Sequence, residues 1–499
     1  MRMNANGRKI VIIGGGIAGL CTGVYAQKCG YQAQVLEMSD MAGGLATSWR
    51  RHGYTFETCL HWFVGSKPGG EMHDQWMEIF DVEQLEFVNP VEFVRIETQN
   101  GETLRIPTDV SELEAEFLRR APQDESEIRR LTSAIRDLGK LRMPDPRKGW
   151  MGNLGTYVHD LPYIPTLLKF SKMTGREYAS RFSDPLIRSF FASGEMEQMS
   201  AIALVISLAW MNAGNAGYSI GGSQAIIRQI QKKLEELGGQ IRLGAPVKRI
   251  VVQGDSAVGV ELASGELVPA DWVVSAADGH ATIFELLEGK YADDLTKRQY
   301  EMRRTFPSYL QVSLGVAMDL KQQPGMLSLL LDSPFYVDPG TELPHVSYRF
   351  FHFDPTFAPA GKTAVTCFLP TRNAEYWTGL ELSDPITYRT EKNRVAEAAI
   401  KILEGRIPGI CRAIDVVDVS TPATVIRYTG NWKGSMEGWM PTPATGFKPL
   451  RNTLPGLKHF VMAGQWILPG GGLPSGMLTA RPAIQAICRA DRVPFGVRE

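Results

Sequence analysis

Cysteine is scarce in this 499-residue chain, and its six cysteines show no pairing pattern. They occur at positions 21, 29, 59, 367, 411 and 488, without a Cys-x-x-Cys motif and without the spacing of a metal site. Disulfide scaffolds and cysteine-based metal sites depend on such spacings. We therefore expect a protein of a reducing compartment that carries no metal.

Net charge and long apolar runs are also lacking. The 53 basic and 54 acidic residues leave a formal charge of −1, which argues against nucleic acid as the main partner. The apolar stretch Ala201–Met211 is shorter than the roughly 20 residues of a membrane span, and residues 1–9 are too polar for a signal peptide. We expect a cytoplasmic protein that is soluble or lies on a membrane surface.

A glycine-rich turn near the start of the chain is the strongest positive signal. The β-branched run Lys9–Ile13 predicts a buried parallel strand, and Gly14-Gly15-Gly16-Ile17-Ala18-Gly19 follows it directly, before a helical segment at Leu20–Lys28. A second strand, Tyr31–Leu36, ends at Glu37, 23 residues after Gly14, where an acid can accept hydrogen bonds from ribose hydroxyls. Such a turn lets a pyrophosphate approach the backbone and the helix N-terminus. This arrangement predicts a dinucleotide site.

Three further blocks extend this site along the chain. Met41-Ala42-Gly43-Gly44-Leu45-Ala46 lies shortly after Glu37 and is followed by Gly53-Tyr54-Thr55-Phe56-Glu57. Gly221-Gly222-Ser223 leads into an amphipathic helix, Gln224–Leu237, and then into short strands that end at Val274-Ser275-Ala276-Ala277. Near the C-terminus a strand ending in Ala463-Gly464 precedes Pro469-Gly470-Gly471-Gly472-Leu473-Pro474 and a helix from about Met477 to Ala490.

Taken together, these blocks resemble the extended FAD signature of the amine oxidase and phytoene desaturase superfamily. The C-terminal Pro-Gly-Gly-Gly-Leu-Pro run looks most like the carotenoid isomerase and retinol saturase branch. Leu45 departs from the pattern, since relatives often carry arginine there, so the helix end or another arginine is expected to balance the pyrophosphate. The resemblance implies that FAD contacts Gly14, Gly16, Ile17, Ala18, Gly19, Glu37, Met38, Gly43, Gly44, Leu45, Val247, Ala276, Gly464, Gly472, Leu473 and Met477.

The resemblance also implies a fold. We expect an α/β flavoprotein of two domains, in which a Rossmann-like FAD-binding domain is interleaved with an α+β substrate domain. The discontinuous FAD-binding domain comprises residues 1–65, 218–288 and 455–499. The substrate-binding domain comprises 66–217, which is helix-rich and forms a lid, and 289–454, with strands such as Gln311–Met318 and a helix at Ser383–Glu404. No cysteine lies in the C-terminal glycine motif, so the FAD is expected to be non-covalent.

By resemblance, the activity is that of an FAD-dependent oxidoreductase. The substrate would be an apolar isoprenoid or polyene whose carbon–carbon double bonds are desaturated, saturated or isomerised through hydride exchange with flavin N5. A flavin amine or porphyrinogen oxidase on the same fold is one alternative. A carrier of prenylated ligands, similar to the GDP-dissociation inhibitors, is another. The sequence does not identify the electron donor or acceptor.

His61 is the candidate for acid–base catalysis. It lies in Cys59-Leu60-His61-Trp62-Phe63, directly beyond the segment expected to pass the flavin. A histidine can donate or accept a proton near neutral pH. The alternative is that its ring only hydrogen-bonds the backbone at the wall of the pocket.

A basic and aromatic segment precedes the middle of the chain. Basic residues at 136, 140, 142, 147 and 148 come before Trp150, Met151, Leu154 and Tyr157, with further apolar residues up to Phe170. This combination suits a peripheral contact with a bilayer interface. The alternative is a solvated basic turn before a helix of the core.

Overall fold

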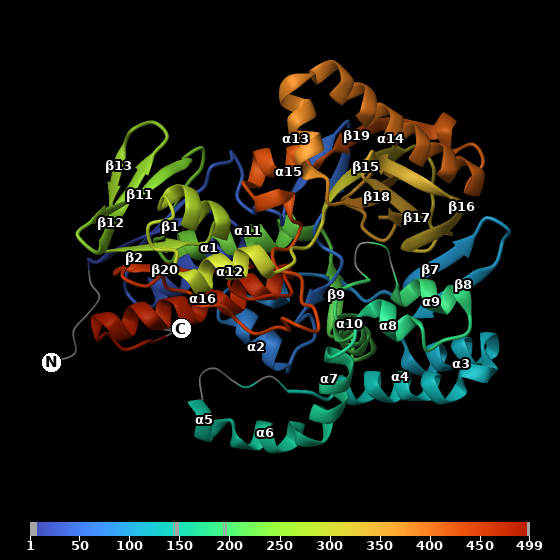
Figure 1. Ribbon diagram of the computed structural model, residues 1–499, viewed down its shortest axis with the longest axis horizontal. Coiled ribbons are helices and arrows are strands. Elements are labelled where there is room, and N and C mark those ends of the chain that lie inside the picture. The colour runs from blue at the N-terminus through green and yellow to red at the C-terminus, as the bar shows by residue number, and fades with distance from the viewer. Residues whose placement is uncertain (1–6, 143, 145–148, 193, 195–196, 497–499) are drawn as a thin grey trace.

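A five-stranded parallel sheet forms the centre of one half of the molecule. The computed structural model describes residues 7–142, 144, 149–192, 194 and 197–496 (Figure 1). β1 lies in the middle of this sheet because its apolar run is buried between its neighbours. The strand order is β10 (Gln240–Arg242), β2 (Gln32–Leu36), β1 (Lys9–Ile13), β14 (Trp272–Ser275) and β20 (Phe460–Met462).

Three helices pack against this sheet, and one antiparallel sheet extends it. α1 (Ile17–Lys28) contacts both α11 (Gly222–Glu236) and α16 (Gly472–Asp491), and the three share one apolar core. α16 begins at Gly472, five residues before the predicted start at Met477, because the glycine run itself enters the helix. The small antiparallel sheet comprises β11 (Val247–Gln253), β12 (Ser256–Leu262) and β13 (Leu267–Pro269).

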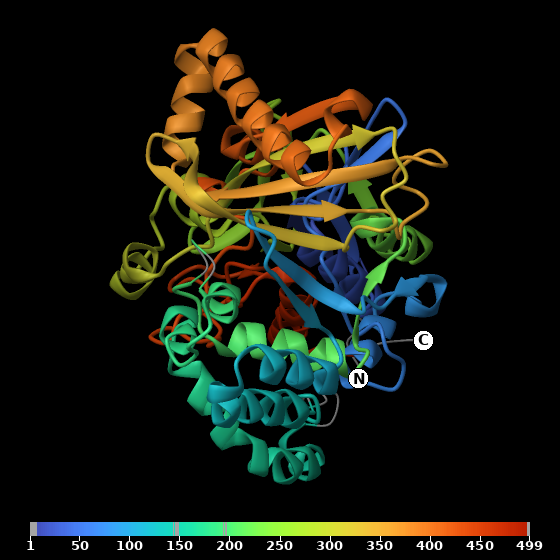
Figure 2. The same cartoon turned by 90° about the vertical axis from the view of Figure 1, so that its right-hand side faces the viewer.

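A seven-stranded mixed sheet forms the second half of the molecule. α14 (Pro385–Arg406) packs on one face of this sheet, and the helices of residues 110–212 lie toward the other (Figure 2). Its only parallel pair joins β7 to β16, two strands that are more than 200 residues apart in the chain. The strand order is β19 (Ile414–Ser420), β15 (Ser308–Val316), β18 (Thr363–Thr371), β17 (Thr341–Phe350), β16 (Met326–Asp338), β7 (Glu92–Thr98) and β8 (Thr103–Pro107).

The long helix expected in the second half of the chain lies close to its predicted bounds. The helix predicted at Ser383–Glu404 is α14 (Pro385–Arg406), which begins two residues later because Asp384 caps it and Pro385 occupies its first position. The remaining α-helices of the described residues, in both halves, are α2 (Glu71–Met77), α3 (Val110–Arg120), α4 (Glu125–Leu138), α5 (Gly149–Gly152), α6 (Leu154–Asp160), α7 (Ile164–Ser171), α8 (Gly175–Ala179), α9 (Pro185–Phe191), α10 (Ile202–Asn212), α12 (Asp294–Met302), α13 (Ala374–Ser383) and α15 (Pro422–Thr429).

Short strands connect the two halves. The hairpin of β3 (Ser48–Arg51) and β4 (Tyr54–Glu57) follows the second glycine pair. β9 (Ala216–Ser219) pairs with β5 (Phe63–Val64) and β6 (Phe87–Val88). All strands of the five-stranded sheet fall within residues 1–65, 218–288 and 455–499. We propose these segments as the FAD-binding domain and 66–217 with 289–454 as the substrate domain.

Candidate active site

The turn after β1 brings the backbone at the end of this strand close to the backbone of α1. Gly14 adopts a φ of +96°, which favours glycine. A Cβ at Gly19 would lie 1.9 Å from the carbonyl oxygen of Gly14, so no side chain fits between strand and helix there. Gly16 caps α1 without a side-chain hydrogen bond, and the first turn holds no acid. The N-terminus of α1 is therefore free to offer its N–H groups to an anion.

Glu37 is fixed at the end of β2 by two backbone donors. Gly15 N donates to Oε2 at 2.6 Å, and Ser39 N donates to Oε1 at 2.8 Å. Burial raises the pKa of this carboxyl, while the two backbone hydrogen bonds oppose the rise. Each carboxyl oxygen retains a lone pair that can accept a hydrogen bond from a sugar hydroxyl.

These groups border a cavity of about 310 Å³, which we call the cofactor cavity. Gly19 and Met477 are not part of its lining: Gly19 packs against Gly14, and Met477 is buried in the core between α1 and α16. The other residues expected to contact FAD do line it, namely Gly14, Gly16, Ile17, Ala18, Glu37, Met38, Gly43, Gly44, Leu45, Val247, Ala276, Gly464, Gly472 and Leu473.

Basic side chains are missing from the described lining of the cofactor cavity. Leu45 is apolar, and no arginine or lysine among the described residues lines the cavity. The charged groups of the lining are instead the acids Glu37, Asp278, Glu285 and Glu437. The N-terminus of α1 is consequently the group best placed to balance a pyrophosphate.

Two acids of this cavity, the buried Asp278 and the partly buried Glu437, were not found from the sequence. Burial raises the pKa of Asp278 to about 7, although it accepts hydrogen bonds from the N–H groups of Ala281 and Trp432, each at 2.8 Å. Burial likewise raises the pKa of Glu437 to about 7. Within the described part of the chain, Glu437 has no hydrogen bond or ion pair. It packs closely against the glycine run, because a Cβ on Gly471 would lie only 2.3 Å from the Cβ of Glu437. An isolated acid in the apolar run Met436–Met440 was the available sequence signal.

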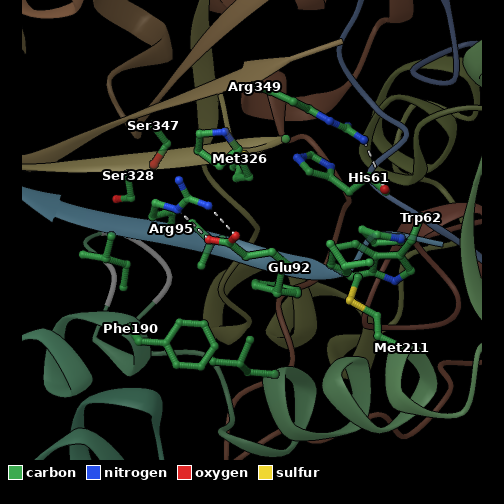
Figure 3. A pocket seen from close by; sticks show the side chains of 18 of the residues that line it. His61, Trp62, Glu92, Arg95, Phe190, Met211, Met326, Ser328, Ser347 and Arg349 are labelled. Atoms are coloured by element: carbon green, nitrogen blue, oxygen red, sulfur yellow. Dashed lines mark hydrogen bonds and ion pairs between the residues drawn. The ribbon is translucent and has the colours of Figure 1, made fainter. Parts of the chain in front are cut away.

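A larger cavity of about 690 Å³ lies between the seven-stranded sheet and the helices α9 and α10, and we call it the substrate cavity. Figure 3 shows its two unlike walls. Phe190 and Met211 come from the helices, whereas the sheet contributes the serines Ser328 and Ser347 and the ion pair of Glu92 with Arg95 (Figure 3). Both carboxyl oxygens of Glu92 bind Arg95, at 3.0 and 2.8 Å. A mostly apolar cavity with a few fixed polar groups is typical of a small-molecule site.

His61 lies in the substrate cavity. Its Nδ1 is 3.2 Å from the carbonyl oxygen of Cys59, and its ring faces the cavity beside Trp62 (Figure 3). Desolvation by the surrounding walls and the nearby Arg349 guanidinium lower the pKa of His61 to about 4, although its side chain is exposed to the cavity. The imidazole is therefore neutral and a weak base at neutral pH. The geometry supports the wall position and the backbone hydrogen bond more than a proton-transfer role.

Arg349 and Glu57 hold the loop that carries His61. Arg349 donates to the carbonyl oxygens of Leu60 and His61 and lies over the rings of Tyr218, Phe351 and Phe353. Glu57 accepts hydrogen bonds from the N–H groups of Leu60 and Ser223, which fixes β4 to the start of α11. This loop passes from one cavity to the other, because Cys59 lines the cofactor cavity and His61 the substrate cavity.

The parallel sheet, the glycine turn and the acid at the end of β2 are typical of a dinucleotide-binding protein. The sequence model of the family described as flavin containing amine oxidoreductase matches residues 17–488, so the chain belongs to this family. The chain is therefore an FAD-dependent oxidoreductase.

Relatives and solved structures agree with this assignment. The chain is 25% identical over 449 residues to a chloroplastic prolycopene isomerase of Daucus carota, covering 85% of this chain and 71% of that protein. It is 24% identical over 501 residues to a neurosporene-forming phytoene desaturase of Cereibacter sphaeroides, covering 93% and 92%. An oxidoreductase from Methanosarcina mazei shares the fold with a TM-score of 0.61 at 17% identity, covering 96% of this chain and all of that one. Putrescine oxidase shares it with a TM-score of 0.61 at 16% identity, covering 97% and 99%.

Proposed function

We propose that this chain desaturates, saturates or isomerises carbon–carbon double bonds of an apolar isoprenoid or polyene. The observation that carries the proposal is the junction at Cys59 and His61, where a glycine-lined cofactor cavity and a largely apolar cavity are two residues apart. The names of the relatives, a prolycopene isomerase and a phytoene desaturase, support a substrate of this class.

One set of residues would bind the cofactor, and another would position the substrate. FAD, when bound, supplies hydride exchange. We propose that it is held non-covalently by the lining residues of the cofactor cavity named above, with Gly19 acting through the packing of α1. Phe190, Met211 and Trp62 would exclude water from the substrate, and His61 would orient it. Glu437, with a pKa near neutrality, would hold or release a proton beside Gly472.

An amine substrate fits the substrate cavity less well. A protonated amine needs an available carboxylate, and Glu92, the acid in the described lining, is already engaged by Arg95 through both oxygens. The likeness to putrescine oxidase, at 16% identity, concerns the fold alone. A flavin-free carrier of prenylated ligands is disfavoured by membership of a flavin-containing family.

The test uses the purified FAD-loaded protein and a panel of polyenes, once with oxidised and once with photoreduced flavin, without oxygen. Mass spectrometry of the products should show a gain or loss of two hydrogens, or an unchanged mass with a shifted retention time. The flavin state that supports turnover gives the direction of electron flow. If amines react while no polyene does, the proposal is wrong.

A further inference from the structure

The segment from α5 to α7 exposes an apolar stripe instead of burying it. Leu154, Tyr157, Val158, Leu161, Ile164 and Leu168 recur every three or four residues, and each is 39–63% exposed. Trp150 and Met151 precede them and are 68% and 81% exposed. Side chains at this spacing share one face of a helical segment. We call these eight residues the apolar ridge.

In residues 149–160, which form α5 and α6, the inward side is polar, which reverses the usual arrangement, whereas α7 buries Phe170 in the core. Asn153 is 4% exposed and donates to the carbonyl oxygen of Gly149, while Asp160 is 9% exposed and accepts from the N–H of Arg142. α4, in the same domain, has the usual arrangement, because its apolar side chains Ile128, Leu131 and Ile135 are buried in the core. Soluble proteins rarely leave a contiguous apolar face in water, so the ridge has a partner.

The shape and charge of this region fit a lipid surface. α5 and α6 protrude along the lower margin of the molecule, away from both sheets (Figure 1). A convex ridge can enter the interface of a bilayer without a matching groove. Lys140, Arg142, Lys169 and Lys172 flank it with exposed basic groups, which suit anionic headgroups. Arg147 and Lys148, also expected to contribute, lie outside the described residues.

The ridge is joined to the wall of the substrate cavity. The hydroxyl of Ser200 donates to the carbonyl oxygen of Ser171, the last residue of α7, at 2.9 Å. Gly175 N donates to Met199 O at 2.9 Å, and Gly175, Met199 and Ser200 all line the substrate cavity. An apolar substrate dissolved in a bilayer would therefore reach the molecule beside this cavity.

We propose that the apolar ridge docks this chain onto the surface of a bilayer that contains anionic lipid. No helix of the described residues has both the length and the apolar character to cross a membrane, so the contact is interfacial. The ridge holds the protein at the membrane.

The experiment is flotation of the FAD-loaded protein with vesicles of phosphatidylcholine, with and without phosphatidylglycerol. The double variant Met151→Glu/Leu161→Glu places charges on the ridge. The matched control is Leu382→Glu/Ile386→Glu, because these two side chains are 84% and 74% exposed on α13 and α14, at the opposite end of the molecule (Figure 1). Flavin absorbance and thermal unfolding of each variant check that it remains folded.

The wild-type chain and the control should float with phosphatidylglycerol vesicles, and the ridge variant should bind at least about tenfold more weakly. Binding should decrease as salt increases, because charge contributes to it. Absence of flotation for the wild type, or equal flotation of both variants, would overturn the proposal. So would a wild-type dimer in solution that the ridge variant converts to a monomer, since the ridge would then bind a second copy.

Discussion

The two cavities of this chain are built in opposite ways. The cofactor cavity is bounded partly by glycine backbone that has no room for a side chain: a Cβ at Gly43 would lie 2.6 Å from the carbonyl oxygen of Ala46. The substrate cavity is bounded by side chains from β7, β16, β17, α9 and α10. Backbone fixes one ligand, whereas a cavity lined by side chains can be reshaped without altering the fold. This difference suits a cofactor cavity that holds one ligand, FAD, and a substrate cavity whose side chains determine which substrate binds.

The largest effect is expected where the backbone leaves no room. Gly19→Ala should lower the FAD content of the purified protein by more than about tenfold, because its Cβ would meet the carbonyl oxygen of Gly14 at 1.9 Å. The ratio of flavin to protein absorbance measures this content. Gly405→Ala is the matched control, because a Cβ there meets nothing within 4 Å. Equal FAD content in the two variants would show that close packing at Gly19 is not needed for FAD binding.

Filling the second cavity should separate binding of the cofactor from turnover. Ser347→Phe adds a ring to the sheet wall of the substrate cavity and should lower kcat/KM for the polyene by at least about tenfold. FAD content should stay at the wild-type level. Glu342→Phe, on the same strand but exposed, should change neither quantity. Loss of FAD in Ser347→Phe alone would show that the two cavities are not independent.

Glu437 predicts a pH-dependent difference in stability. Its pKa is raised by burial from 4.5 to about 7, so the folded state holds the proton more tightly than the unfolded chain. The carboxyl therefore costs stability increasingly as the pH rises from about 4.5 through 7, and the cost is complete above that. Glu437→Gln removes it and should unfold at a higher temperature than the wild type at pH 8.

Thermal unfolding at pH 4.5 and pH 8 measures this effect. The gain of Glu437→Gln should vanish at pH 4.5, where the wild-type carboxyl is neutral in the folded state. Glu285→Gln is the matched control, because Glu285 also lies on the cofactor cavity but is 67% exposed. A gain of equal size at both pH values would mean that titration of Glu437 is not its cause.

The smallest effect is expected at His61. Because the pKa of its imidazole is lowered to about 4, His61→Ala should reduce kcat by less than about tenfold and leave the pH profile between 6 and 8 unchanged. Steady-state kinetics with the reacting polyene gives both quantities. A larger loss in kcat, or an inflection that disappears with the histidine, would restore His61 as a proton-transfer residue.

The sequence predicted the cofactor side well because its signals are local. Gly14 to Glu37 form one continuous strand–turn–helix–strand unit, and the blocks at Gly43, Ala276 and Gly464 each follow or precede a strand. The start of α16 was misplaced because a glycine run gives no helix signal of its own, although Gly472 begins the helix.

The substrate side could not be read in the same way, because its residues meet only through tertiary structure. Arg95 lies beside Ser328 and Ser347 only because β7 pairs with β16 across more than 200 residues. Glu437 enters the cofactor cavity from a loop without regular periodicity. The apolar residues of the ridge could be recognised in the sequence. That they face outward could be learned only from the structure, in which Asn153 and Asp160 are the buried side chains.

The most direct test of the joined cavities is a structure of the chain with FAD and a bound polyene. The flavin ring should lie at the Cys59 end of the cofactor cavity, with a carbon of the polyene in van der Waals contact, about 3.5–4.0 Å from it, and the remainder of the chain between Phe190 and Ser347. A flavin ring turned away from Cys59, or a polyene bound outside the substrate cavity, would contradict the account.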